Sequence, residues 1–248
     1  MWMKILHYEM KRIWLGRLFP ILLICNGIYA YLWMNQTGIG GIGGTAPFSL
    51  WTYMAFCGSM LPPAALTMLL MQAKYYSLKQ QKDDILPLAS PCSAEMLLFL
   101  RQLALLCCFA AIFLLDSAVF LYPCIRYFKQ TAALANLLPG LLLMLPCIIL
   151  ALALGTLVGR LHGKLIYLLA TILLAAGLFQ TDSPFDLFCG SYFSERPLAL
   201  PIGPDGEVAF CIETVWLVMR FLYLAAAIAL TAFCLYRQPK PKRTEAAI

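Results

Sequence analysis

The feature of this sequence that most limits its fold is a long stretch without charge, because no Asp, Glu, Lys or Arg lies between Arg17 and Lys74. Soluble domains carry roughly 25% charged residues, spread along the chain. Over all 248 residues, 62% are hydrophobic and only 12% are charged. These values exclude a water-soluble globule, a disordered chain and a disulfide-rich secreted scaffold. An integral membrane protein remains.

The stretches between charged residues define the membrane spans, since a helix needs about 20 mainly apolar residues to cross roughly 30 Å of hydrocarbon. The stretch from Arg17 to Lys74 holds two spans, joined by a glycine-rich turn over 38–44. The six predicted spans are 18–34, 48–71, 96–122, 134–158, 165–181 and 214–236. The predicted fold class is therefore all-α, with residues 1–248 forming one transmembrane domain of six helices.

The distribution of Lys and Arg predicts the orientation, because these residues concentrate in cytoplasmic loops. With the N-terminus inside, 14 of the 18 Lys and Arg residues lie on or near the inner face. Arg126, Lys129 and Arg196 lie outside, and Arg220 falls within the sixth span. Both termini are therefore predicted to be cytoplasmic. Contact of the inner basic residues with anionic lipid headgroups explains the net charge of +6 without a nucleic acid partner.

Residues 1–17 are predicted to form an interfacial helix ahead of the first span. The apolar residues that share one helical face are Trp2, Ile5, Leu6, Met10 and Ile13. Lys4, Lys11 and Arg12 fall largely elsewhere, as is typical of a helix lying along the inner membrane surface. A solvated lead-in to the first span remains the alternative. A cleaved signal peptide is not expected, because no small-residue cleavage site follows the first span.

The predicted outer segment, 182–213, is acidic and rich in proline, and it is too short to form a core of its own. Its apolar residues are compatible with a short helix that dips into the outer interface, and a plain connecting loop is the equal alternative. Cys189 and Cys211 share this segment and could form a disulfide bond on an oxidising exterior. Cys124 is also predicted to lie outside, so the pairing stays open.

The predicted inner segment, 72–95, carries the most informative pattern in the chain. Basic residues end the second span, an acidic pair follows at Asp83 and Asp84, and Pro91 and Ser93 come next. Proline cannot donate a hydrogen bond within a helix, whereas a serine side chain accepts one from an amide at a helix start. We expect a short cytoplasmic helix, then a break, and then the third span.

This pattern resembles the segment between the second and third spans of type-2 ABC exporter permeases. In that family, a short charged helix is followed by a leucine pair, a proline, a Ser or Thr two residues later, and a basic residue that enters the third span. Those places are held here by 79–84, Leu86 and Leu88, Pro91, Ser93 and Arg101. Family members often carry a Glu-Arg and a Gly-Thr pair where this chain has Lys79-Gln80 and Asp83-Asp84.

The resemblance extends to the basic leader, the six spans and the long outer segment. It implies that two permease subunits, identical or different, form the pathway in a bacterial cell membrane, each resting on a separate ATP-binding subunit that holds ATP and Mg²⁺. It also implies that this chain exports an amphipathic peptide, drug or lipid, as in permeases that expel lantibiotics and related peptide antibiotics. The residues that it assigns to coupling with the ATPase are Lys79, Gln80, Asp83, Asp84, Leu86, Pro91 and Ser93.

The residues themselves indicate no catalytic or metal site in this chain. The tripeptide Gly163-Lys164-Leu165 lacks the hydroxyl and the glycine spacing of a phosphate-binding loop, so any ATP must be hydrolysed by another polypeptide. The two histidines, His7 and His162, belong to no catalytic pattern, and the ten cysteines contain no Cys-x-x-Cys. We therefore expect neither an enzyme nor a bound cofactor.

Asp116 and Arg220 are the two charged residues predicted to lie well inside spans, and they fall at similar depth. Charged residues in a bilayer are costly and usually pair, so an ion pair between them is one hypothesis. The alternative is that Arg220 extends to the outer headgroups while Asp116 faces water. Two rival classes of function remain. One is a small ion-driven carrier or channel, which would need acidic residues near mid-membrane. The other is a membrane scaffold that transports nothing, or an unrecognised intramembrane enzyme.

Overall fold

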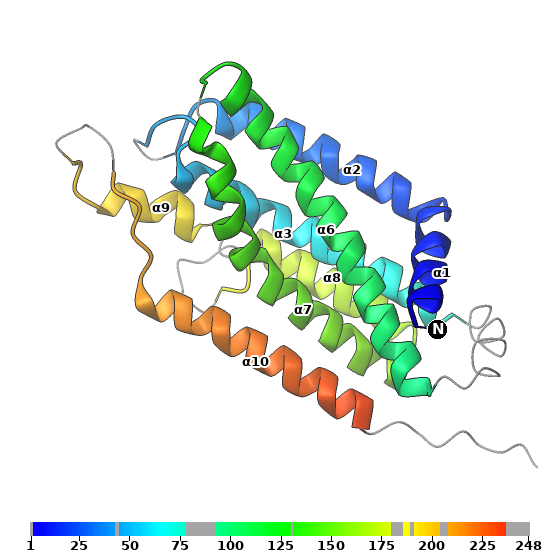
Figure 1. The fold of residues 1–248 in the computed structure, drawn as a ribbon. Helices are drawn as coiled ribbons and strands as arrows, with labels where there is room; N and C mark the ends of the chain where they lie inside the picture. The colour runs from blue at the N-terminus through cyan, green and yellow to red at the C-terminus, as the bar shows by residue number, and fades with distance from the viewer. Residues whose placement is uncertain are drawn as a thin grey trace, which may run out of the picture.

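The computed structural model describes residues 2–42, 45–77, 93–129, 131–179, 186–188, 191–203 and 208–236. Within these ranges the chain forms helices joined by turns, without a β-strand (Figure 1). The predicted all-α class is confirmed for this part of the chain.

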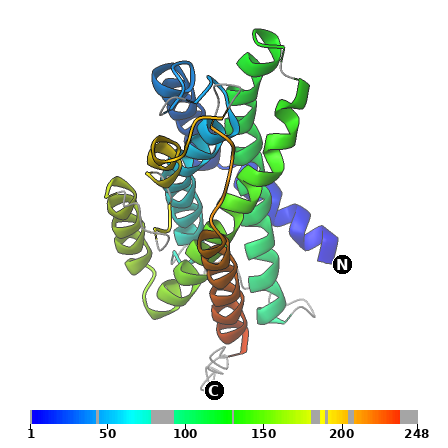
Figure 2. The same ribbon diagram turned by 90° about the vertical axis from the view of Figure 1, so that its left-hand side faces the viewer.

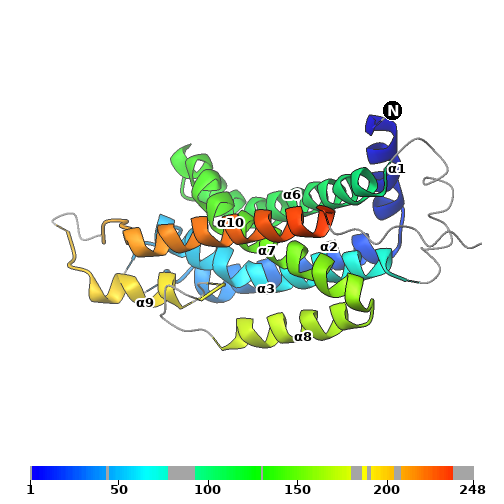
Figure 3. The ribbon, with the colours of Figure 1, turned by 90° about the horizontal axis from the view of Figure 1, so that it is seen from below.

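The long helices run side by side and alternate in direction (Figures 1 and 3). They are α2 (Leu18–Trp33), α3 (Leu50–Tyr75), α6 (Ala94–Arg126), α7 (Leu137–Leu161), α8 (Leu165–Leu178) and α10 (Thr214–Tyr236). A π-helical turn, η1 (Met34–Gly38), prolongs α2, and a 3-10 segment, η2 (Thr131–Asn136), leads into α7.

Two shorter helices mark the two ends of this bundle. Helix α1 (Trp2–Trp14) crosses one end at a steep angle, beside the start of α6, and helix α9 (Tyr192–Ala199) lies at the opposite end (Figures 1 and 3). These ends are called the α1 end and the α9 end below. A helix is therefore present within 1–17, and it lies across the long helices; its interfacial location stays a prediction.

Five helical stretches are long and apolar enough to cross a membrane. They are Leu18–Gly38, Leu50–Tyr75, Glu95–Arg126, Leu134–Leu161 and Thr214–Tyr236. They agree with five of the six predicted spans. Helix α8 has only 14 residues, which at 1.5 Å per residue reach about 21 Å, less than the roughly 30 Å of hydrocarbon. The predicted span 165–181 is thus shorter as a helix than expected, and part of it lies outside the described residues.

Helix α3 is the centre of the bundle. It contacts α2, α6, α7, α8 and α9, and 78% of its most apolar window is buried, against 17% for α10. In the end view of Figure 2, α6 and α8 lie on opposite sides of it. Its start is fixed by Ser49, whose Oγ accepts a hydrogen bond from the Thr52 amide at 3.3 Å. The helix continues through Pro62 and Pro63.

Glycines on α7 allow it to approach α3 closely. A Cβ atom at Gly155 would overlap the side chain of Gln72, and one at Gly159 would lie 2.7 Å from the ring of Tyr76. The spacing of four residues places both glycines on one face of α7, which is the arrangement that brings membrane helices together. The packing of α7 against α3 therefore depends on the absence of side chains at these two positions.

The turn between α2 and α3 is closed by its own polar groups. Gly41 has a φ of +73°, a conformation that favours glycine. The Thr45 hydroxyl donates to the carbonyl oxygen of Ile42 at 2.6 Å, and the Thr45 amide donates to the same oxygen at 2.9 Å. Thr45 thus satisfies the Ile42 carbonyl oxygen within the turn itself.

Helix α9 and the non-helical segment that follows it cover the α9 end of the bundle. Phe193 is fully buried, and its ring centroid lies 5.3 Å from that of Trp216 and 6.3 Å from that of Trp51. The indole N–H of Trp51 donates to the carbonyl oxygen of Val208 at 3.3 Å. Of the two alternatives for the segment 182–213, the short helix is the one that the structure contains.

Candidate functional site

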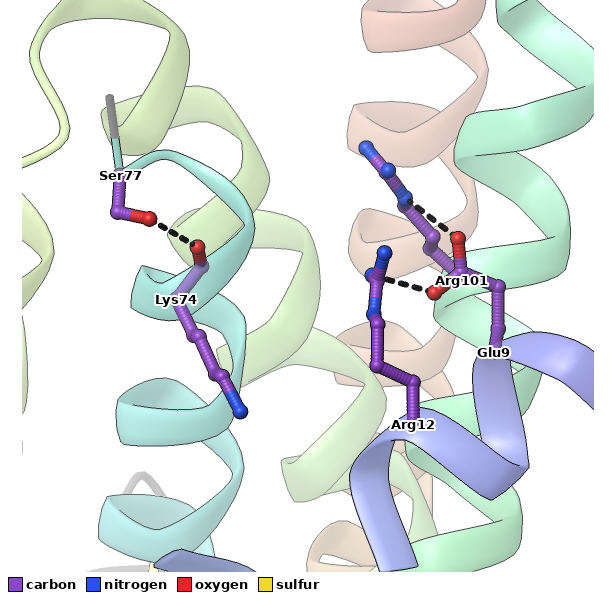
Figure 4. Close-up of polar contacts among 5 residues, drawn as sticks. All are labelled: Glu9, Arg12, Lys74, Ser77 and Arg101. Atoms are coloured by element: carbon purple, nitrogen blue, oxygen red, sulfur yellow. Dashed lines mark hydrogen bonds and ion pairs between the residues drawn. The ribbon is translucent and has the colours of Figure 1, made fainter. Parts of the chain in front are cut away.

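A buried carboxylate at the α1 end joins α1 to α6. The side chain of Glu9, on α1, has no exposed surface and forms ion pairs with Arg12 of the same helix and with Arg101 of α6 (Figure 4). The Nε–H group of Arg101 donates to Oε1 of Glu9 at 3.4 Å. Glu9, Arg12 and Arg101, together with Tyr75, are called the Glu9 cluster below.

Tyr75, the last residue of α3, completes the cluster through its aromatic ring. The guanidinium groups of Arg12 and Arg101 lie 5.2 Å and 4.9 Å from the ring centroid. Such cation–π contacts contribute about 0.5–2 kcal/mol each. Removing one member of a buried ion pair costs about 3–5 kcal/mol, since the other charge is left uncompensated. The cluster therefore fixes α1, the end of α3 and the first turns of α6 to one another.

These helix ends are the ones that flank residues 78–92. On one side, Ser77 follows α3 and its hydroxyl donates to the Lys74 carbonyl oxygen at 2.9 Å (Figure 4). On the other side, the Oγ of Ser93 accepts a hydrogen bond from the Met96 amide at 3.2 Å, so Ser93 is the N-cap of α6. The helix start predicted from Pro91 and Ser93 is therefore found at Ser93.

The other residues predicted to couple the chain to an ATPase lie outside the described residues. They are Lys79, Gln80, Asp83, Asp84, Leu86 and Pro91. Their coupling role stays a prediction, as does that of Ser93. The structure shows the contacts that hold the two helix ends on either side of them in the sequence, the end of α3 and the start of α6.

A network of amides and hydroxyls links α3, α6 and α7 inside the bundle. Gln72, which is 1% exposed, donates from Nε2 to the Leu152 carbonyl oxygen at 2.9 Å and to the Thr156 hydroxyl at 2.8 Å. The Nε2 group of Gln102 donates to the same hydroxyl at 2.7 Å. The network lies one turn of α3 away from Tyr75, so the end of α3 is held by polar contacts on two successive turns.

Arg220 has partners other than the predicted Asp116. Its guanidinium group lies 2.8 Å from the carbonyl oxygens of Asp186 and Leu187 and 2.8 Å from the sulfur of Cys147. It also lies over the ring of Trp216, 4.7 Å from the centroid. Arg220 thus ties α10 and α7 to the chain that leads into α9.

Asp116 is buried and has no hydrogen-bond partner among the described residues. It is 2% exposed, and neither carboxylate oxygen accepts a hydrogen bond from them. The neighbouring Ser117 hydroxyl instead bonds the hydroxyl of Tyr53 on α3 at 2.9 Å. Asp116 and Arg220 therefore do not form the ion pair that their similar depth suggested, because backbone carbonyl oxygens take the place of the carboxylate.

The cysteines and acidic residues give no sign of a metal site in the ranges that the structure describes, where no group of three or more His, Cys, Asp or Glu side chains is close enough to hold an ion. Cys211 is exposed and Cys124 is buried, and neither is bonded to another cysteine of the described residues. Cys189 lies outside the described residues, so its pairing with Cys211 remains open.

Sequence reasoning missed Glu9 and the glycine pair on α7. Glu9 has its second partner 92 residues away, and no local pattern reports such a contact. The signal that could have found it is a lone acid within a basic, otherwise amphipathic leader. The glycine pair is visible in the sequence as Gly155-Thr-Leu-Val-Gly159, a spacing that indicates close packing of membrane helices.

Comparison with known proteins gives this chain no family. No model of a protein family matches the sequence, and neither a curated protein nor a solved structure gives a significant match.

Proposed function

We propose that this chain is the membrane-spanning subunit of an ATP-driven exporter of the type-2 ABC kind, located in a bacterial cell membrane. Two such subunits would form the pathway, and a separate ATP-binding subunit would bind ATP and Mg²⁺ and contact each of them. The cargo would be an amphipathic peptide, drug or lipid. The chain would contribute the pathway and the coupling surface, with no covalent chemistry of its own.

The observation that carries this proposal is the Glu9 cluster. Nucleotide-driven export requires a surface where a partner's movement is passed to several helices at once. The Glu9 cluster binds α1, α3 and α6 together beside residues 78–92, the segment that resembles the coupling element of the family. A displacement of this segment by a partner would therefore be transmitted to three helices rather than to one.

The placement of basic residues supports a cytoplasmic α1 end. The Lys and Arg residues on described segments that meet there are Lys4, Lys11, Arg12, Arg17, Lys74, Arg101, Arg160 and Lys164. Arg126, Lys129 and Arg196 belong to segments at the α9 end. Such an excess on one side is typical of the cytoplasmic face. An ATPase would therefore dock at the α1 end.

The path of the chain supports a sixth crossing despite the length of α8. Helix α7 ends at the α1 end and α9 lies at the α9 end, and α8 runs between these positions alongside α3 (Figures 1 and 3). Gly177 of α8 packs against the ring of Pro62 of α3, where a Cβ would come within 2.6 Å. With α8 as the return pass, α1 and the end of α10 would lie on the same side of the membrane.

An apolar cavity supports an amphipathic cargo. It has a volume of about 360 Å³ and lies between α6, α7 and α10. Phe99, Leu106 and Ile228 line it together with the polar side chains of Gln102 and Thr231. Ligand sites typically combine apolar walls with a few polar groups, as this one does.

Asp116 favours a second candidate function, an ion-driven carrier. A buried acid without a partner inside a membrane bundle is a common feature of ion and proton pathways. Such a carrier would move its cargo in cells depleted of ATP and would stop when a protonophore collapses the proton gradient. The exporter proposed above would behave in the opposite way, so the two treatments separate these functions.

The decisive experiment is purification of the full-length chain from its own membranes, followed by assay of the bound proteins for ATP hydrolysis. We expect an ATP-binding subunit to co-purify and its turnover to rise in proteoliposomes that contain the chain. Asp83→Lys and Pro91→Ala should each reduce this stimulation about tenfold or more, whereas Asp205→Lys, the same charge change in the 182–213 segment, should leave it unchanged. Absence of any such subunit, or equal activity of all variants, would refute the exporter assignment.

A further inference from the structure

A cavity at the α1 end is lined by positively charged side chains and by no acidic side chain of the residues that the structure describes. It has a volume of about 480 Å³ and lies between the end of α3 and the turn that joins α7 to α8. Arg160, His162 and Lys164 line one side, and Tyr76, Ser77 and Tyr167 line the other parts. Ligand cavities in proteins range from about 300 to 1,000 Å³, so this one has the size of a binding site.

The cations in this cavity have no ion-pair partner in the part of the chain that the structure describes. Neither Arg160 nor Lys164 forms an ion pair with a carboxylate of the described residues, and no Asp or Glu is among the described residues that line the cavity. The Nδ1 atom of His162 accepts a hydrogen bond from the Lys164 amide at 3.2 Å. The neutral ring must then carry its proton on Nε2, which makes it a further donor. An anion with several acceptor oxygens suits such a set of donors.

The surface next to the cavity is apolar. A ligand with both an anionic group and an apolar part would therefore bind here better than a soluble anion. Leu165, Leu168 and Ile172 lie on one face of α8, at spacings of three and four residues. Leu168 and Ile172 are 56% and 55% exposed, and Tyr167 at the mouth of the cavity is 53% exposed. In a bilayer, this face would contact acyl chains, while the cavity would lie at the level of the headgroups.

From this combination we infer that the cavity binds the phosphate group of an anionic phospholipid, whose acyl chains lie along the exposed face of α8. Arg160 and Lys164 contact the phosphate oxygens, and His162 donates a hydrogen bond from Nε2. Basic recesses between membrane helices are known to hold anionic headgroups in this way. The site does not depend on the exporter assignment, because it requires only the cavity and a bilayer.

The test uses the full-length protein in neutral detergent, supplemented with phosphatidylglycerol, phosphatidylcholine or inorganic phosphate. Native mass spectrometry would count the lipids retained, and thermal unfolding would report stabilisation. We expect phosphatidylglycerol to be retained and to raise the unfolding temperature, with little effect of the other two. At about 1 kcal/mol per basic residue, Arg160→Gln with Lys164→Gln should weaken phosphatidylglycerol binding about thirtyfold.

Two further variants keep the result interpretable. Lys164 is exposed, so Lys164→Glu should fold normally and still reduce phosphatidylglycerol retention. Lys4→Gln with Lys11→Gln removes two exposed charges from α1 and should leave retention unchanged. Equal binding of phosphatidylcholine, equal stabilisation by inorganic phosphate, or equal loss in the α1 variant would each overturn the proposed lipid site.

Discussion

Glu9 of α1 and Arg101 of α6 are joined by an ion pair across 92 residues of sequence, and both side chains are nearly or fully buried. Through this pair, a helix that crosses the end of the bundle is attached to one that runs along it. Removing one partner would leave the other charge buried and uncompensated, so breaking this pair costs more than breaking a surface ion pair.

Replacing Glu9 by glutamine should destabilise the protein by about 3–5 kcal/mol, because Arg12 and Arg101 would then face each other without a carboxylate between them. Thermal or denaturant-induced unfolding in detergent would measure the change. Glu95→Gln is the matched control, since Glu95 is exposed in the first turn of α6, and it should cost less than about 1 kcal/mol. Equal effects of the two substitutions would show that Glu9 does not hold α1 in place.

Replacing Gly155 by alanine should cost about 1–3 kcal/mol, because the new methyl group would overlap the Gln72 side chain and separate α7 from α3. The same unfolding measurement applies. Gly40→Ala serves as the control, since the nearest atom to a Cβ there is 4.0 Å away. If Gly155→Ala were as stable as the control, the close approach of α3 and α7 would be refuted.

A double-mutant cycle on Asp116 and Arg220 should show independent effects. Arg220→Gln removes charge-assisted bonds to the carbonyl oxygens of Asp186 and Leu187, at a cost of about 1.5–3 kcal/mol. Asp116→Asn should cause little loss, because it removes a buried charge that no described residue pairs with. The coupling energy between the two should stay below about 0.5 kcal/mol. A larger value would restore the ion pair that the sequence suggested.

The positions of the spans could be predicted because hydrocarbon thickness and helix rise leave little freedom. The last span, 214–236, agrees with α10, and the others differ mainly at their ends. Helix α6 begins earlier and ends later than the predicted 96–122. The charged residues Glu95 and Arg126 lie outside the predicted span but within the helix, whereas Arg101 lies inside both and pairs with Glu9.

The contacts of individual charges could not be predicted, since depth in the membrane does not fix which way a helix face points. Asp116 and Arg220 share a depth, yet the nearest acceptors of Arg220 are carbonyl oxygens, which every residue carries and no charge pattern reveals. The predicted length of the span 165–181 differs from that of α8 for another reason. Composition alone shows where an apolar stretch extends, but it does not show where the helix within it ends.

The turn between α2 and α3 bears on how the protein enters the membrane. Residues 38–49 contain no charged side chain, and Thr45 satisfies part of the backbone internally. Carrying this turn across the hydrocarbon during biosynthesis therefore involves no desolvation of an ionised group. Helices α2 and α3 can be inserted together as a hairpin from the side where Arg17 and Lys74 remain, which would deliver the central helix already paired with its first neighbour.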